Sequence, residues 1–151
     1  MVTKAVQRVT VSSKLIDHWE QVCQKLVALA EEVPETKFEY RPVVDVRTFA
    51  DVLRHVAFWN RYVADSARGT KGDGTANELP RDGYSTKTRI VDALKRSAAD
   101  AADALKGNAS GLSPEMAEMV VTFIEHNCEH YGQLVVYARL NEIVPPASRG
   151  S

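Results

Sequence analysis

Three of the four histidines in this chain could bind one metal ion together. His126 and His130 are four positions apart, and on a helix this spacing turns two side chains to within about 40° of each other, one turn apart. Two imidazoles arranged in this way can chelate a divalent metal. His55 lies on the inward face of an earlier predicted helix, so we expect it to supply a third nitrogen.

A site of three neutral imidazoles would leave one coordination position open. An open position is typical of catalytic metals, whereas structural sites are usually closed by four protein ligands. Such a metal could bind a thiol as thiolate, or lower the pKa of a bound water to about 7. The alternative is that the histidines are ordinary hydrogen-bonded core or surface residues, because an i, i+4 pair also arises by chance.

Three polar residues near the histidines are candidates for a catalytic role. Gln133 follows His130 by three positions and could orient that ring or bind substrate, although a satisfied buried amide is an equal alternative. Glu129 could act as a general base beside the pocket, where a solvated helix charge is the ordinary alternative. Tyr62 has a hydroxyl that could reach the pocket, where a core aromatic is the ordinary alternative.

Other polar residues are weaker candidates. Asp51 lies one turn before His55 and could accept a hydrogen bond from that ring, but its place in a capping box already explains it. His18 lies at the edge of the first predicted helix's apolar stripe. Cys128 lies about 200° from His126 on a helical wheel, which makes it a poor ligand and a poor nucleophile.

Four amphipathic helices are predicted to position these residues, over about 13–32, 48–67, 85–106 and 113–141. Thr48 and Asp51 form a capping box at the start of the second helix. Ser113 is the expected N-cap of the fourth, with Pro114 at its first position. No β pattern of useful length appears, so the sequence predicts an all-α protein with a four-helix bundle.

The segment from Gly69 to Tyr84 is predicted to be a long loop, because it is rich in Gly, Asp, Asn and Pro. About 16 extended residues can span roughly 50 Å, whereas a twenty-residue helix is only about 30 Å long. The loop can therefore return the chain to the start of the second helix and leave helices two and three parallel. Loops of this length also serve as lids, which mildly favours an enzyme.

Composition limits the remaining possibilities. The chain has 151 residues and a net charge of −1, which predicts one domain over 1–146, a frayed tail over 147–151, and no electrostatic footprint for nucleic acid. No apolar run is long enough for a membrane span, and residues 1–10 lack the apolar core of a secretory signal. The two cysteines are far apart in the sequence, which indicates reduced thiols and a cytoplasmic protein.

Two segments resemble a known family. The run from His126 to Gln133, followed by Tyr137–Leu140 and Pro145-Pro146, is similar to the C-terminal signature of the DinB/YfiT-like superfamily, and Thr48–Ala57 is similar to its second-helix motif. The resemblance spans essentially the whole chain. It implies a four-helix bundle with a divalent metal held by three histidines, which are carried onto His55, His126 and His130. Nickel and zinc are the expected metals, with manganese or iron as alternatives.

The resemblance also implies an activity. Some members of that superfamily are thiol-dependent S-transferases or isomerases that use mycothiol, bacillithiol or glutathione, and many have no known activity. We therefore expect a metal-dependent thiol S-transferase or hydrolase that acts on a small electrophilic substrate. The alternative is a non-catalytic, metal-binding dimeric bundle with a stress-related or binding role.

A second apolar stripe on the fourth helix suggests a homodimer. It lies opposite the histidines, and Gly132 beside it would allow close approach of another backbone. A two-fold interface across this helix is the simplest way to cover the stripe, since most soluble oligomers are cyclic dimers. The alternative is that a neighbouring helix of the same bundle covers it. The stripe consists of Ala117, Val121, Ile124, Cys128 and Val135, with Tyr131 at its edge.

Overall fold

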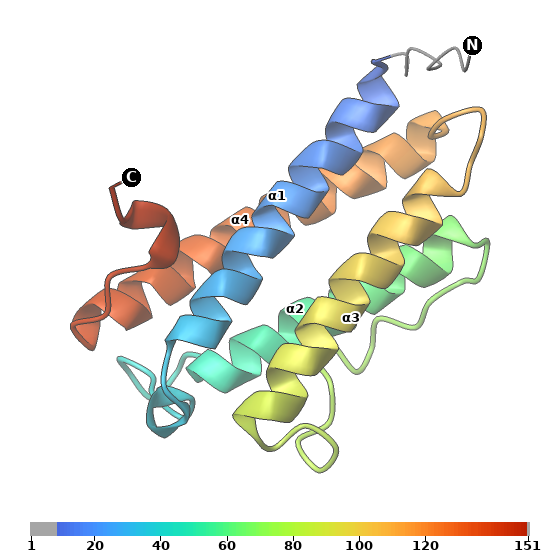
Figure 1. Cartoon of the computed structure of the whole chain (residues 1–151). Coiled ribbons are helices and arrows are strands. Elements are labelled where there is room, and N and C mark those ends of the chain that lie inside the picture. Colours follow the sequence, from blue (N-terminus) through green and yellow to red (C-terminus); the bar gives the residue numbers. More distant parts are fainter. Residues whose placement is uncertain (1–8, 151) are drawn as a thin grey trace.

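The protein is a four-helix bundle in a computed structural model that describes residues 9–150 (Figure 1). The helices are α1 (Val11–Glu32), α2 (Phe49–Ala67), α3 (Lys87–Lys106) and α4 (Pro114–Leu140). Two short 3-10 helices accompany them: η1 (Glu35–Lys37) between α1 and α2, and η2 (Pro146–Ser148) after α4. All regular structure in the described residues is helical, which confirms the predicted fold class. In the same part of the chain, no helix has the length and apolarity that crossing a bilayer requires.

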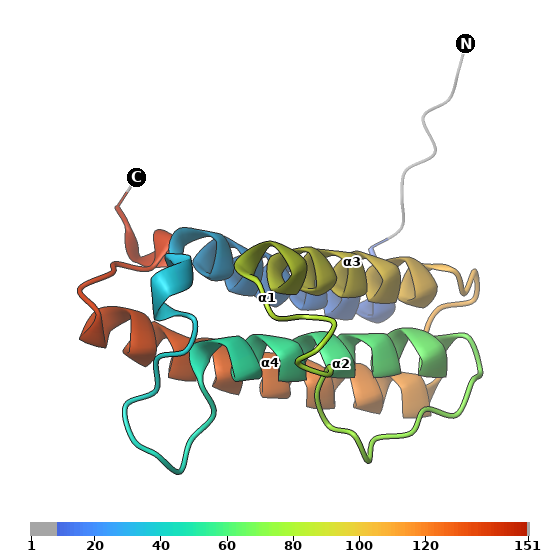
Figure 2. The same ribbon diagram turned by 90° about the horizontal axis from the view of Figure 1, so that it is seen from below.

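The helices form two layers, with α1 beside α3 and α2 beside α4 (Figure 2). Helices α2 and α3 run parallel, as predicted from the length of the loop between them. Near their starts, Arg54 donates to the carbonyl of Tyr84 just before α3 (2.8 Å). Near their ends, Arg68 donates to Asp100 (2.6 Å). Helices α2 and α3 lie in different layers. Within each layer the two helices run antiparallel (Figure 1).

The predicted helix ends are close to the observed ones because most are set by local side-chain caps. The hydroxyls of Thr48 and Ser113 cap α2 and α4 as expected. The first helix begins two residues earlier than predicted, because Thr10 and Ser13 form a capping box with Ser in the position usually held by Glu or Gln. The third helix begins two residues later than predicted, with Thr86 as its N-cap.

The helix α4 buries a different line of residues from the one predicted. The line consists of Val120, Asn127, Leu134 and Ala138, each 0 % exposed. It runs between the histidine face and the apolar stripe of Val121 and Cys128. The prediction of two separate opposed apolar arcs is therefore wrong: the arc is continuous, and its middle faces the core.

The loop from Gly69 to Tyr84 lies along α2 (Figure 1). It is held there by backbone as well as side-chain contacts, such as the amide of Leu79 donating to the carbonyl of Arg54 (3.3 Å). This anchoring places the second half of the loop beside the start of α2, where His55 lies.

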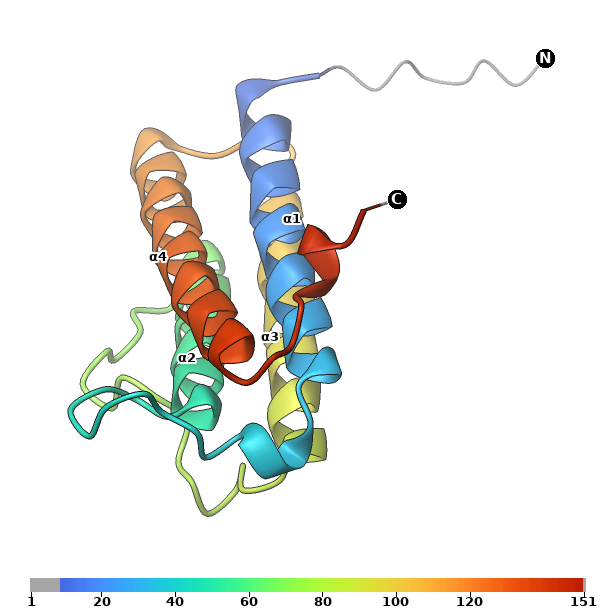
Figure 3. The same cartoon turned by 90° about the vertical axis from the view of Figure 1, so that its left-hand side faces the viewer.

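The C-terminal segment packs against the end of α1 (Figure 3). Arg149 donates to Glu32 (2.5 Å) and to the carbonyl of Val144 (3.0 Å). The frayed tail predicted over 147–151 is therefore wrong for residues 147–149, while Ser151 lies outside the described residues. The expectation about a secretory signal falls mostly on residues 1–8, which are also outside them.

Candidate metal centre

His55 of α2 meets His126 and His130 of α4 in the layer that these two antiparallel helices form. One potential ligand atom from each ring lies within 4.8 Å of the other two. The ring centroids of His126 and His130 are 4.5 Å apart, and each lies less than 5 Å from that of His55. His55 is buried at 6 % exposure, and the other two are partly exposed. The cluster therefore has a closed side at His55 and an open side at α4.

Each imidazole donates its Nδ1 proton into a hydrogen-bond chain that ends on a backbone carbonyl. His55 Nδ1 donates directly to the carbonyl of Asn77 (2.6 Å). His130 Nδ1 donates to Gln133 Oε1 (3.0 Å), Gln133 donates to the Tyr137 hydroxyl (2.8 Å), and that hydroxyl donates to the carbonyl of Arg47 (2.9 Å). Because a carbonyl can only accept, the last bond of each chain fixes the direction of the others.

The hydrogen-bond chain behind His126 is longer, and its bonds beyond Asn127 are buried. His126 Nδ1 donates to Asn127 Oδ1 (3.1 Å), and the Asn127 amide donates to Asn60 Oδ1 (3.3 Å). Asn60 donates to Ser97 Oγ (3.3 Å), which donates to the carbonyl of Leu94 (3.0 Å). The same Asn127 amide also lies 3.8 Å from Cys23 Sγ. The chain crosses from α4 through α2 to α3, so the bundle core itself orients this ring.

These bonds leave the Nε2 atoms of the three rings without protons, in the tautomer that suits a metal ligand. The Nε2 atoms of His55 and His126 are only 2.9 Å apart. Two lone pairs at this separation repel each other unless a cation lies between them. Two nitrogens each about 2.1 Å from one metal are about 3 Å apart when the angle at the metal is near 90°, so the residues fit a divalent metal.

Burial keeps the rings neutral. It lowers the pKa of His55 to about 4, an effect that the hydrogen bond to Asn77 opposes and the positive charge of Arg47 reinforces. Burial is also the main cause that lowers the pKa of His126 and of His130 below the ordinary value. Neutral imidazoles at pH 7 do not need to lose a proton before they bind a metal.

Aromatic rings lie beside the cluster toward the start of α4. The ring of Phe123 is 5.7 Å from that of His126 and is stacked on Trp59 at 5.4 Å. The Tyr62 ring is 6.0 Å from Phe123, on the side away from the histidines. The Cα atoms of Gly72 and Gly74 approach the Tyr62 and Trp59 rings so closely that a Cβ would lie 2.5 Å and 2.8 Å from them. The loop therefore covers the outer faces of this wall.

The candidate residues have different places around the cluster. Gln133 orients His130, which is one of the two alternatives predicted for it. Glu129 is exposed, and its negative charge raises the pKa of His126 and of His130, an effect smaller than that of burial. His18 is exposed on α1 and is not part of the cluster.

Asp51 is a structural carboxylate and does not contact His55 through any recorded hydrogen bond within residues 9–150. It caps α2 and binds the guanidinium of Arg54 (2.6 Å) and of Arg81 (2.7 Å). Burial raises the pKa of Asp51, but hydrogen bonds from Arg54 and Thr48 and the charges of both arginines outweigh this and lower the pKa. The capping alternative is therefore correct, and the ion pair to a buried arginine was not predicted.

Sequence reasoning missed three residues that surround the cluster. Asn127 gave a signal, since it is a polar residue in the middle of α4's apolar arc, next to a histidine. Asn77 gave none, because it acts through its backbone carbonyl from a loop, at a positive φ of 62°. Arg47 precedes the α2 cap and is brought to the site only by folding.

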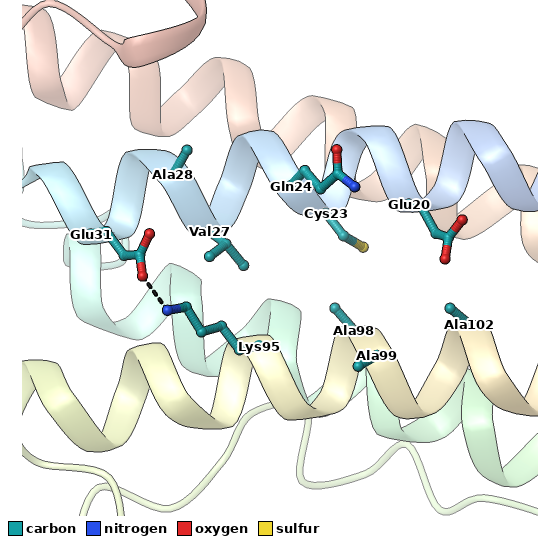
Figure 4. A pocket seen from close by; sticks show the side chains of 10 residues that line it. All are labelled: Glu20, Cys23, Gln24, Val27, Ala28, Glu31, Lys95, Ala98, Ala99 and Ala102. Atoms are coloured by element: carbon teal, nitrogen blue, oxygen red, sulfur yellow. Dashed lines mark ion pairs between the residues drawn. The ribbon is translucent and has the colours of Figure 1, made fainter.

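A groove of about 340 Å³ lies on the opposite side of the bundle, between α1 and α3 (Figure 4). Ala98 and Ala102 line it, and their small side chains leave space between the helices. Glu31 and Lys95 pair across one end. Burial raises the pKa of Cys23, which also lines the groove, to about 12, so this thiol stays protonated at neutral pH. The groove is separate from the histidine cluster.

Comparison with known proteins agrees with the fold and the cluster. Among curated proteins, no sequence matches the chain. Residues 18–134, well over half of the chain, match the sequence profile of the DinB superfamily. The matched range contains His55, His126 and His130, whereas Tyr137–Leu140 and Pro145-Pro146, which also resemble the family signature, lie beyond it. The chain belongs to the DinB superfamily.

Proposed function

We propose that this protein is a divalent-metal-dependent enzyme that transfers a small thiol to an electrophilic substrate, or hydrolyses such a substrate. His55, His126 and His130 would hold the metal through Nε2, with nickel or zinc as the expected metal and manganese or iron as alternatives. The observation that carries the proposal is the convergence of one potential ligand nitrogen from each of three imidazoles, whose Nδ1 protons are all donated to oxygen acceptors. Without a cation, the Nε2 lone pairs of His55 and His126 would repel each other, which would lower the stability of the folded state.

The residues around the cluster support an exchangeable position rather than a closed one. Within residues 9–150, the group of potential metal ligands contains only the three histidines. Asp51 is held by arginines and His18 is exposed, so neither is placed to complete the coordination sphere. A metal with a free position lowers the pKa of a bound thiol or water, which provides a nucleophile at neutral pH.

The chain's own residues would prepare the site for this chemistry. Asn77, Asn127 and Gln133 hold the three rings in one tautomer and one orientation, which reduces the cost of assembling the site. Trp59 and Phe123 exclude water from one side. Glu129 remains the candidate for proton transfer, because its charge acts on two of the rings, whereas Tyr62 lies beyond Phe123.

Elemental analysis of gently purified protein, followed by a thiol-transfer and hydrolysis panel with the metal found, tests the proposal. We expect about one divalent metal per chain and a turnover that needs it. A protein that contains and binds no divalent metal would overturn the metal site. A metal-loaded protein inactive throughout the panel would instead favour the non-catalytic bundle.

One observation favours the second candidate, a metal-binding dimeric bundle without catalysis. Val121 is 40 % exposed and Cys128 is exposed, whereas Ile124 and Val135 are partly buried, so the helices of the same chain cover the predicted stripe on α4 only in part. A second copy of the chain is our proposed occupant of this face.

We also propose a cytoplasmic location, supported by two free thiols, Cys23 and Cys128.

A further inference from the structure

Arg47 contacts the segments that orient two of the three histidines, His130 and His55. Its carbonyl accepts the hydroxyl of Tyr137, which ends the hydrogen-bond chain behind His130. Its Nε lies 3.3 Å from Glu78, and the preceding residue, Asn77, accepts from His55. The backbone of Arg47 is therefore held by α4, and its side chain is held by Glu78 of the loop. Its charge lowers the pKa of all three histidines, in each case less than burial does.

The guanidinium of Arg47 has capacity to bind an anion. Within residues 9–150 its two Nη atoms donate no recorded hydrogen bond, and its one ion pair, through Nε, is formed with side chains that are 37 % and 34 % exposed. A pair this exposed contributes little to stability, so a ligand can share or replace it. Arg54 is different, because it is 2 % exposed and bonded to Asp51 and Tyr84. A planar guanidinium with free Nη atoms favours a carboxylate, which it can bind through two parallel bonds.

The opposite side of the cluster is apolar. Phe123 and Trp59 form the wall next to His126, one turn along α4 and α2 from the histidines. Arg47 lies in the other direction, before the N-cap of α2, where its carbonyl meets Tyr137, two turns beyond His130 on α4. Along the bundle axis, the three imidazoles thus lie between an aromatic wall on one side and the cation of Arg47 on the other.

We infer that the site takes a thiol of peptide size whose carboxylate binds Arg47 and an electrophile whose apolar part packs on Trp59 and Phe123. The inference rests on the proposed function and assigns its substrate class. In the transfer, the thiolate sulfur forms a bond to the electrophilic carbon, the leaving group departs with the bonding electron pair, and the thiol proton passes to solvent. Arg47 is a specificity-determining residue in this scheme and takes no part in the bond-making step.

The test compares thiols that differ only in their carboxylates. Glutathione and its diethyl ester are titrated into the cobalt-loaded protein, and binding is followed by sulfur-to-metal absorbance. We expect the wild type to prefer glutathione about tenfold, as one charge-assisted hydrogen-bond pair provides. In Arg47→Gln this preference should fall to within about twofold. Arg47→Lys, which keeps the charge but not the planar fork, should lie between them.

Arg41→Gln is the matched control, since it removes one exposed positive charge from the same segment of the chain. It should keep the full preference for glutathione. An equal preference in wild type and Arg47→Gln, with circular dichroism showing both folded, would overturn the inference.

A second pair of probes separates this inference from the proposed function. The binding of 4-phenylbutanoate and of its amide to the metal-loaded protein is measured by calorimetry. If neither thiol binds but the binding of the carboxylate probe still depends on Arg47, the proposed thiol activity is wrong and the carboxylate-binding role of Arg47 stands. If neither pair of probes shows a carboxylate preference that Arg47 determines, including the case in which nothing binds, the inference is wrong.

Discussion

At the scale of single residues, the site is a set of three imidazoles whose second nitrogens are all engaged. His55 relies on one carbonyl in the loop, His130 on a side-chain relay within α4, and His126 on a buried chain that reaches α3. The spacing of His126 and His130 is a local property, so the sequence predicted their pairing. The hydrogen-bond chains that orient these two rings, in contrast, end on segments that are distant in the sequence.

Removing one imidazole should release the metal. In His130→Ala two nitrogens remain, and we expect affinity to fall by more than the 10- to 100-fold typical of losing only a supporting hydrogen bond. Competition with a chromogenic chelator measures the effect. His18→Ala, which removes an exposed histidine, is the control. Equal metal affinity in wild type and His130→Ala would contradict the proposed ligand set.

Asn77 should act through its backbone conformation. Its φ of 62° costs a residue with a Cβ about 1–2 kcal/mol but costs glycine little. Asn77→Gly and Asn77→Ala both lose the side-chain bond to Trp59, so only the alanine variant should also displace the carbonyl from His55. We expect metal affinity within about twofold of wild type for glycine and about tenfold weaker for alanine. Equal affinities in the two variants would show that the carbonyl does not position His55.

At the scale of elements, the start of α2 fastens the loop to the bundle. Asp51 caps the helix, pairs with the buried Arg54 and reaches Arg81 in the loop. His55 lies one turn after Asp51 on the same helix. The ion pairs of Asp51 and the imidazole of His55 are therefore held by the same part of α2. The sequence predicted the cap because Thr48 and Asp51 are three residues apart. It did not predict the arginines, because Arg81 is thirty positions away.

The pKa of Asp51 determines how stability depends on pH at this point. Since the folded pKa is lowered, the carboxylate stabilises the fold fully above the ordinary carboxyl pKa of about 3.9 and loses this effect as the pH falls through the folded value. Asp51→Asn should cost about 3–5 kcal/mol at pH 7, because it leaves Arg54 buried without its partner. Urea denaturation at pH 7, 5, 4 and 3 should show the difference from wild type shrinking only at the acid end.

Arg81→Gln is the matched comparison, since Arg81 is 64 % exposed. It should cost no more than about 1 kcal/mol. A difference between wild type and Asp51→Asn that is independent of pH would contradict the role of the charged carboxylate.

At the scale of the whole molecule, the bundle has enough core to fold without the metal. Large side chains such as Trp19, Leu53 and Leu134 are fully buried at 0 % exposure. The histidine cluster lies at the edge of this core, between α2 and α4, and is open on one side. Metal binding should therefore add stability to an already folded chain.

Thermal melting should show this addition. A metal at 100 times its dissociation constant stabilises the folded state by about 2.7 kcal/mol, which raises Tm by roughly 5–10 °C for a chain of this size. The chelated protein should still melt cooperatively. Identical melts with and without metal would contradict the site, and a complete loss of the transition on chelation would contradict the independent core.

The uncovered face of α4 should form a two-fold interface. We expect a dimeric mass by light scattering at micromolar concentration, and a monomeric mass for Val121→Lys, which places a charge on the stripe. Val44→Lys changes a valine in a loop that is even more exposed (70 % against 40 % for Val121) and should leave the dimer intact. A monomeric wild type at these concentrations would rule out the interface.

The sequence by itself determined the four helices, their order and the pairing of His126 with His130, because each depends on local spacing. Periodicity, capping pairs and the i, i+4 rule act within one or two turns. The length of the loop allowed the parallel course of α2 and α3. The helical periodicity, the capping pairs and the His126–His130 spacing are local, so they exist before distant parts of the chain are in contact.

Only the tertiary structure decided which residues support the site. Arg47 and Tyr137 are ninety positions apart, and His55 meets Asn77 across a loop with no periodic pattern. The buried line of α4 was also undetermined, because its apolar arc is wide enough for several orientations. Packing against α1 and α2 selected the orientation that buries Asn127 and leaves Val121 uncovered. Such choices depend on which surfaces of distant segments fill the same space, and a local pattern does not contain that information.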